Sequence, residues 1–272
     1  MVNKTVYLYV LVSLAAGYAL LNFFIFSFSN PSVPLLEQAR AAYQEAAQSN
    51  NFFHRRQALN RLLMIYHSLD KLYCPLQGNG ALYSNLAETY YNLEQYPWAA
   101  FYFYQAKRLR PRDLEVEFKL KETLAKLKIP PTQSPSSFKK FFFFHFYFSL
   151  PERLEILCVF TFLLCSLASL LVWKNYVGLK LLVSSVVLVN ALFFCSIIYS
   201  QYLEPIEGVL IHATHLYGEK NLNSALVTLQ PLRGGCKVEV LESGKQGRVL
   251  KIRTPDHLIG FISQESIRLL RP

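Results

Sequence analysis

Two long apolar runs in the second half of the chain dominate its hydrophobic pattern. Residues 156–173 and 181–199 contain no charged side chain, and each is long enough to cross about 30 Å of hydrocarbon as a helix. The segment between them, KNYVGLK, is too short to hold a domain. The pattern therefore predicts a transmembrane hairpin within residues 154–202. Lys174 and Lys180 place its loop on the cytoplasmic side, and both flanking regions on the opposite side.

A third apolar run lies near the N-terminus and follows Lys4. Residues 1–29 are typical of a signal peptide cleaved after Ser29, or of an uncleaved N-terminal anchor. The sequence leaves both alternatives open, and in both the residues that follow are exported.

Residues 34–128 have apolar positions at helical spacing. The chain is expected to turn at residues 70–80, which are rich in turn formers, and to form a long loop at QSNNFFHRR. Asp113 is a favourable N-cap for a last helix. The two apolar stripes expected in the first two helices are Leu35, Ala39, Ala42, Tyr43 and Ala46, followed by Ala58, Leu62, Ile65 and Leu69.

Residues 83–111, YSNLAETYYNLEQYPWAAFYFYQAKRLRP, have small and aromatic residues at the intervals of a tetratricopeptide repeat of about 34 residues. Small residues let two antiparallel helices approach closely, and aromatic residues fill the remaining space. We expect a short array of about two repeats with a capping helix. The signature positions are Tyr83, Leu86, Ala87, Tyr90, Ala99, Phe103, Ala106 and Pro111.

Two further regions flank the predicted hairpin. Residues 129–150 begin with the linker-like PPTQSPSS and continue with FKKFFFFHFYFSL, whose aromatic residues favour the membrane–water interface. Residues 206–272 contain short runs with alternating apolar residues, separated by turn formers, which predict a small SH3-like β-barrel. The alternating pairs are Val238 and Val240, Val249 and Ile252, and Ile259 and Phe261.

This order of segments resembles the BatE family, the tetratricopeptide member of the Bacteroides aerotolerance (Bat) operon. The repeat at 83–111 is similar to the family's form, and LRGGCKVEVLESGKQGRVLKIRTPDHLIGFISQESIRLL is similar to its SH3b pattern. Phe261 and Arg248 stand where tryptophan is common. The resemblance implies a non-enzymatic scaffold at the bacterial inner membrane, with both domains on the periplasmic side. It also implies Bat-type partners with von Willebrand A domains.

The net charge of +10 is spread over the chain, and no segment has the concentrated basic face of a nucleic-acid-binding protein. The five cysteines form no CxxC pair. His212 and His215 lie in a strand-like run, where residues three apart face opposite sides, so we predict no metal site. The sequence predicts no cofactor and no catalytic residues. Asn190, within the second apolar run, is expected to hydrogen-bond to the other helix. For Ser166 and Ser169 in the first run, two alternatives stay open: they are its partners, or they simply allow close helix packing.

The polar side of the first helix in the repeat at residues 83–111 is the candidate binding surface, because its donors and acceptors suit a peptide backbone. Its residues are Ser84, Asn85, Glu88, Tyr91 and Asn92. The chain is thus expected to be a membrane-anchored scaffold that binds inner-membrane or periplasmic proteins. The alternative is an envelope protein that binds peptidoglycan through its SH3b-like tail.

Overall fold

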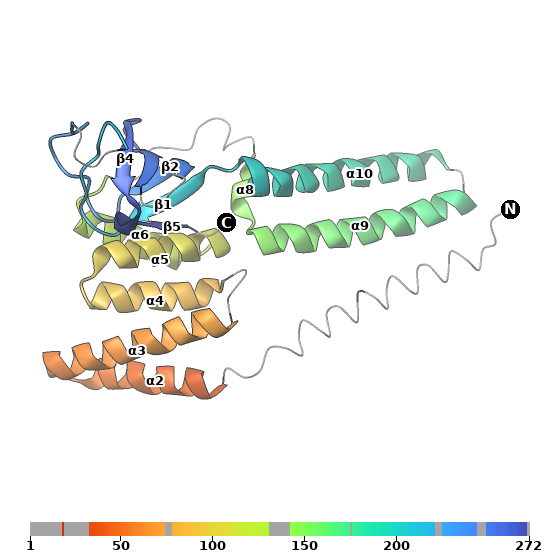
Figure 1. Ribbon diagram of the computed structural model, residues 1–272. Helices are drawn as coiled ribbons and strands as arrows, with labels where there is room; N and C mark the ends of the chain where they lie inside the picture. Colours follow the sequence, from red (N-terminus) through yellow and green to blue (C-terminus); the bar gives the residue numbers. More distant parts are fainter. Residues whose placement is uncertain are drawn as a thin grey trace. The chain divides into compact units, whose positions relative to one another are not determined.

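The computed structural model describes seven parts of the chain, which fall into two compact units (Figure 1). One unit is Met1–Leu36 with Leu150–Tyr199, and the other is Glu37–Ser149 with Ser200–Pro272. The predicted signal peptide or anchor, apart from Tyr18, and residues 131–141 of the predicted linker lie outside the described residues. The described residues are 18, 33–73, 78–130, 142–174, 176–220, 225–243 and 249–270.

The larger unit contains a layered array of consecutive helices (Figure 1). Neighbouring helices pack against one another from α3 to α6, and a single turn, α8 (Phe143–Tyr147), follows the array. The helices of the array are α2 (Val33–Gln48), α3 (Phe52–Tyr73), α4 (Gly80–Asn92), α5 (Tyr96–Leu109) and α6 (Leu114–Lys126).

Local sequence signals account for the helix ends. The Asn79 side chain accepts hydrogen bonds from the backbone N–H groups of residues 81 and 82 and so caps α4. Pro97 lies in the first turn of α5, where its missing N–H leaves no intrahelical bond unmade. The predicted N-cap Asp113 is confirmed, because its carboxylate accepts from the N–H groups of Glu115 and Val116.

The contact between α4 and α5 consists of the repeat's signature residues. Ala87, Ala99 and Ala106 are fully buried, which allows the two helices to pack closely. Tyr83, Leu86, Tyr90 and Phe103 are also buried, and Pro111, after the end of α5, is half-buried. The first seven residues are therefore buried as close packing requires, and Pro111 follows the end of α5 at Leu109.

Two expectations for the first helical pair are wrong. Tyr43 is exposed, although Ala39, Ala42 and Ala46 on the same helix are buried, so the small residues alone form the contact stripe. The predicted long loop at QSNNFFHRR is short, because helix α3 already begins at Phe52. Asn51 accepts a hydrogen bond from the Phe53 N–H and thus starts the helix early.

The smaller unit contains two helices that are long and apolar enough to cross a membrane, α9 (Leu150–Trp173) and α10 (Val177–Ile198). Only 6% and 11% of the residues in their most apolar stretches are buried, unlike the core helix of a soluble protein. Both helices begin earlier than the apolar runs predict, and only residues 174–176 separate them. Helix α10 continues into one π-helical turn, η1 (Tyr199–Leu203).

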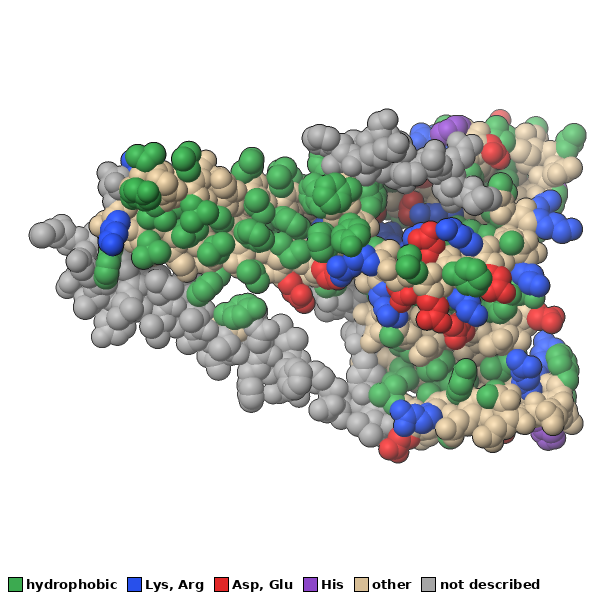
Figure 2. Space-filling model, turned by 180° about the vertical axis from the view of Figure 1, so that it is seen from behind, with side chains coloured by type: hydrophobic (Ala, Val, Ile, Leu, Met, Phe, Trp, Pro, Cys, Tyr) green, Lys and Arg blue, Asp and Glu red, His purple; other side chains and the backbone are tan. Residues whose placement is uncertain are grey.

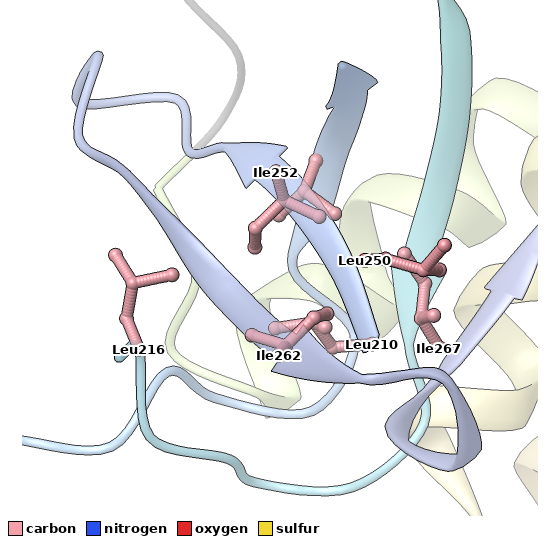
Figure 3. Packing of buried hydrophobic residues seen from close by; sticks show 7 residues of the cluster. Leu210, Leu216, Leu250, Ile252, Ile262 and Ile267 are labelled. Atoms are coloured by element: carbon pink, nitrogen blue, oxygen red, sulfur yellow. The ribbon is translucent and has the colours of Figure 1, made fainter. Parts of the chain in front are cut away.

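The C-terminal part folds into an antiparallel five-stranded sheet with strand order β4-β3-β2-β1-β5. A 3₁₀ turn, η2 (Gln264–Ser266), joins the last two strands. The buried side chains that form its core converge from strands and loop alike (Figure 3). The strands are β1 (Ile206–Leu210), β2 (Lys237–Ser243), β3 (Val249–Arg253), β4 (Ile259–Ser263) and β5 (Ile267–Leu269).

The predicted closed barrel is not observed, because β4 and β5 are the two edges of the described sheet. The outer edge of β4 is instead occupied by Tyr217, which exchanges two backbone hydrogen bonds with Phe261 at 2.8 and 3.0 Å. Of the alternating pair in β4, Ile259 is exposed and Phe261 is half-buried, whereas Gly260 and Ile262 between and after them are buried. Both faces of IGFI are apolar or small, so alternation alone could not choose between them.

Candidate functional site

All five predicted binding residues lie on α4, on the side opposite its contact with α5. The residues that pack inward, such as Leu86 and Ala87, recur every three to four positions. The residues between them therefore remain on the surface. Asn85 and Asn92 are exposed, whereas Ser84, Glu88 and Tyr91 are half-buried.

Tyr91 on α4 is hydrogen-bonded to α6, the second helix after it in the chain. Its hydroxyl donates a hydrogen bond of 2.6 Å to the Glu122 carboxylate on α6. This hydrogen bond is the main reason why the pKa of Tyr91 rises to about 12. The phenol is protonated at neutral pH, and its hydrogen bond joins α4 to α6. The hydroxyl hydrogen is therefore already used in a bond within the protein.

Glu88 interacts electrostatically with titratable groups on two other helices, α3 and α6. Burial raises the pKa of its carboxyl, the Lys119 ammonium on α6 opposes that rise, and Glu115 adds to it. On the other side, burial first and then the charge of Glu88 raise the pKa of Tyr66 on α3. The candidate surface thus extends from α4 to α6, whereas Tyr66 on α3 is buried.

We call this surface the docking face. The sequence identified only its α4 part, because residues on α6 join it through the packing of the array. The spacing of residues along one helix does not show which other helix packs against it. The N-cap Asp113 shows only where α6 begins. The docking face comprises Ser84, Asn85, Glu88, Tyr91, Asn92, Glu115, Lys119 and Glu122.

The docking face offers hydrogen-bond donors, acceptors and charges of both signs. In Figure 2, acidic and basic side chains are interspersed on the surface of the larger unit, whereas hydrophobic side chains cover α9 and α10. Charges of both signs, interspersed on the face shown, suit a polar peptide or protein surface.

An aromatic stack lies behind the docking face. The Tyr90 ring stacks on Tyr102 at a centroid distance of 5.4 Å and on Trp98 at 5.7 Å. The guanidinium of Arg268, on β5, lies 5.5 Å from the centre of the Trp98 ring. The stack therefore connects α4 and α5 to the sheet and gives the docking face a rigid support.

The two histidines considered for metal binding, His212 and His215, lie in the segment that follows β1. Ile211 and His212 form a bend after β1, and His212 is exposed while His215 is half-buried. Among the described residues, no group of three or more His, Cys, Asp or Glu side chains is placed to hold a metal ion. Burial raises the pKa of the Cys236 thiol to about 11, which disfavours the thiolate form that ligates metals.

The expected hydrogen bond from Asn190 to the other apolar helix is present, and its partner is Thr161 rather than Ser166 or Ser169. The Thr161 hydroxyl lies 3.0 Å from the side-chain oxygen of Asn190. Ser166 and Ser169 instead donate to carbonyl groups of their own helix. A hydrogen bond between Arg153 and Ser196, at 2.9 Å, lies near the start of α9.

Comparison of the chain with protein-family models, with curated proteins and with solved structures yields no significant match.

Proposed function

We propose that this protein is a membrane-anchored, non-enzymatic scaffold whose helical array binds other envelope proteins. The observation that carries the proposal is the combination, in one chain, of two helices able to cross a membrane and a polar face spread over two helices, α4 and α6. Such a face recognises an extended segment through many weak polar contacts. A membrane anchor suits it when the partners are themselves membrane proteins.

We further propose that the array is of the tetratricopeptide type and that the protein acts in a Bat-like complex at the bacterial inner membrane. The burial of seven of the eight signature residues supports the first part. The strand order of the tail, with a 3₁₀ turn between β4 and β5, supports an SH3-like topology in an open form. Von Willebrand A domain proteins are the expected partners, by resemblance to the BatE family.

The orientation follows from the hairpin. Since α9 and α10 are antiparallel and only residues 174–176 connect them, the start of α9 and the end of α10 lie on one side of the membrane. Lys174 and Lys180 near the connection favour the cytoplasm for that end. The helical array and the sheet would then both be periplasmic.

Site-specific photo-cross-linking in intact cells tests the docking function. Asn85 and Asn92 are suitable positions for the photo-reactive residue because both are exposed, whereas Tyr91 is bound to Glu122. Asn60, an exposed asparagine on α3, is the matched control. We expect adducts to membrane or periplasmic proteins from the two α4 positions only.

A charge reversal separates specific adducts from chance encounters. Lys119→Glu places a third carboxylate beside Glu88 and Glu115, and it should abolish the adducts formed from Asn92. Asn60→Ala should leave them unchanged. If the folded protein gives the same adducts from Asn60 as from Asn92, or none from either α4 position, the docking function is wrong.

A second candidate function is peptidoglycan binding by the tail. It is favoured by an apolar strip at the edge of the sheet, where Tyr217 forms bridges with both Leu226 and Phe261. Directly paired residues point to the same side, so these three side chains face the same way. Retention of the detergent-solubilised full chain on purified murein, and its loss in Phe261→Ser, would establish this function. No retention of the native chain would exclude it.

A further inference from the structure

Exposed aromatic and aliphatic residues gather on the two segments that flank the spanning helices. One segment is α8, just before α9, and the other is the end of η1 and the start of β1, just after α10. We call these residues the foot. Its members are Phe143, Phe146, Tyr147, Tyr202, Leu203 and Ile206, all of them exposed.

Both parts of the foot are attached to the same end of helix α5. The Arg112 guanidinium, just after α5, lies 5.4 Å from the ring centres of Tyr147 and Phe148. Arg108, in the last turn of α5, forms an ion pair of 3.3 Å with Glu204. The two arginines are four positions apart, so the segments before and after the hairpin are held at one place on the larger unit.

Chain connectivity limits how far the foot can lie from the ends of the spans. Tyr147 precedes the first residue of α9 by three positions, which an extended chain covers in about 10 Å. Tyr202 and Leu203 belong to the continuous helical run Val177–Leu203. At 1.5 Å per residue this run is about 40 Å long, about 10 Å more than the hydrocarbon core. One end of it therefore reaches the headgroup region.

We propose that the foot lies in the lipid headgroup region of the membrane that α9 and α10 cross. Phenylalanine and tyrosine favour this depth because it accommodates an apolar ring and a polar edge together. The Arg112 guanidinium beside Tyr147 is placed to meet lipid phosphates. The proposal rests on the membrane anchoring in the proposed function, but it does not depend on the docking function.

Covalent continuity with the spans distinguishes the foot from other exposed apolar residues. Phe118 on α6 and Phe53 on α3 are equally exposed, yet they belong to the helical array and no short connection ties them to a span. The foot, in contrast, cannot move more than a few residues' length from the bilayer. Seated there, it would keep the docking face close to the membrane-proximal segments of partner proteins.

Lipid photo-cross-linking of the full chain tests this proposal. The protein is reconstituted in vesicles of phosphatidylcholine and phosphatidylglycerol, with a photo-reactive phenylalanine at one position at a time. Phe143 (64% exposed) reports on the foot, and Phe118 (66% exposed) is the matched control. Phe162, exposed on α9, reports insertion of the hairpin. Each change keeps an aromatic ring at an exposed position, so the fold is retained.

We expect lipid adducts at Phe143 and Phe162, with at least tenfold less at Phe118. Adducts at Phe162 without adducts at Phe143 would overturn the foot and leave the anchoring intact. Equal adducts at Phe118 and Phe143 would also overturn it, because the contact would then be nonspecific. Absence of adducts at all three positions would overturn the membrane anchoring itself, whatever cross-linking from Asn85 shows.

Discussion

Arg108 and Glu204, which are 96 positions apart, form an ion pair of 3.3 Å that joins the last turn of α5 to the segment between η1 and β1. Both side chains are only 24% exposed. The pair is one of several contacts through which the sheet is attached to the helices. Arg233 also donates a 2.6 Å hydrogen bond to the backbone oxygen of Lys128, after α6.

A double-mutant cycle on this pair measures the attachment. Arg108→Ala and Glu204→Ala should each lower the free energy of unfolding, with a coupling of about 1 kcal/mol, near the upper end for ion pairs with some exposure. Chemical denaturation of the full chain in detergent provides the measurement. The Arg61–Glu45 pair, with side chains 50% and 47% exposed, is the control and should couple by about 0.3 kcal/mol. Equal coupling in both cycles would show that the Arg108 pair has no special role.

Gly235 is a second point of attachment between the helices and the sheet. Its φ is +89°, its N–H donates to the Leu210 oxygen at 2.6 Å, and a Cβ there would collide with the Leu127 side chain. Gly235→Ala should therefore lower the free energy of unfolding by about 2–3 kcal/mol, through backbone strain and overpacking together.

Gly218→Ala is the matched control, because a Cβ at Gly218 would meet only the Ala225 oxygen at 3.5 Å. Its effect should stay within about 0.5 kcal/mol. Thermal unfolding of both variants, followed by circular dichroism, makes the comparison. Similar melting temperatures for the two would contradict the structural role assigned to Gly235.

The sequence predicts single helices and strands better than it predicts the contacts between elements that are distant along the chain. The spacing of Ala87, Ala99 and Phe103 predicts the α4–α5 contact because that contact is local, between consecutive helices. It cannot predict that Tyr91 donates to Glu122, because this contact depends on the angle at which α6 packs. In the tail, apolar residues on both faces of β4 conceal which face is inward, and the pairing of Tyr217 with β4 has no local signal.

The hydrogen bond between Thr161 and Asn190 should stabilise the pairing of α9 and α10. Bonds of this kind between membrane helices average about 0.6 kcal/mol. We expect this coupling between Thr161→Val and Asn190→Leu, measured by unfolding the full chain in mixed micelles of rising SDS content. Ser169 bonds to the Cys165 carbonyl of its own helix, so Ser169→Ala should show no coupling to Asn190→Leu. Coupling of the same size at Ser169 would assign the effect to general repacking.

His67 makes the stability of the helical array dependent on pH. Its Nε2 lies 2.9 Å from the Tyr90 hydroxyl, and its ring contacts those of Tyr90 and Tyr102. Burial lowers the pKa of His67, while the nearby Asp70 opposes that change and Lys71 adds to it. The unfolded chain, with an ordinary histidine pKa of about 6.5, therefore binds the proton more tightly than the folded chain does.

The contribution of neutral His67 to stability is accordingly complete above about pH 6.5 and is lost as the pH falls through the lowered folded pKa. Glu88 acts in the opposite direction, because burial raises its pKa and acid relieves the cost of its charge. His67→Gln retains Glu88 and removes the histidine contribution alone. The difference in unfolding free energy between native chain and His67→Gln should therefore shrink from pH 7.5 to pH 5. Denaturant titrations across this range measure it, with His54→Gln on the exposed side of α3 as control. A difference that stays constant with pH would show that His67 is not protonated on unfolding.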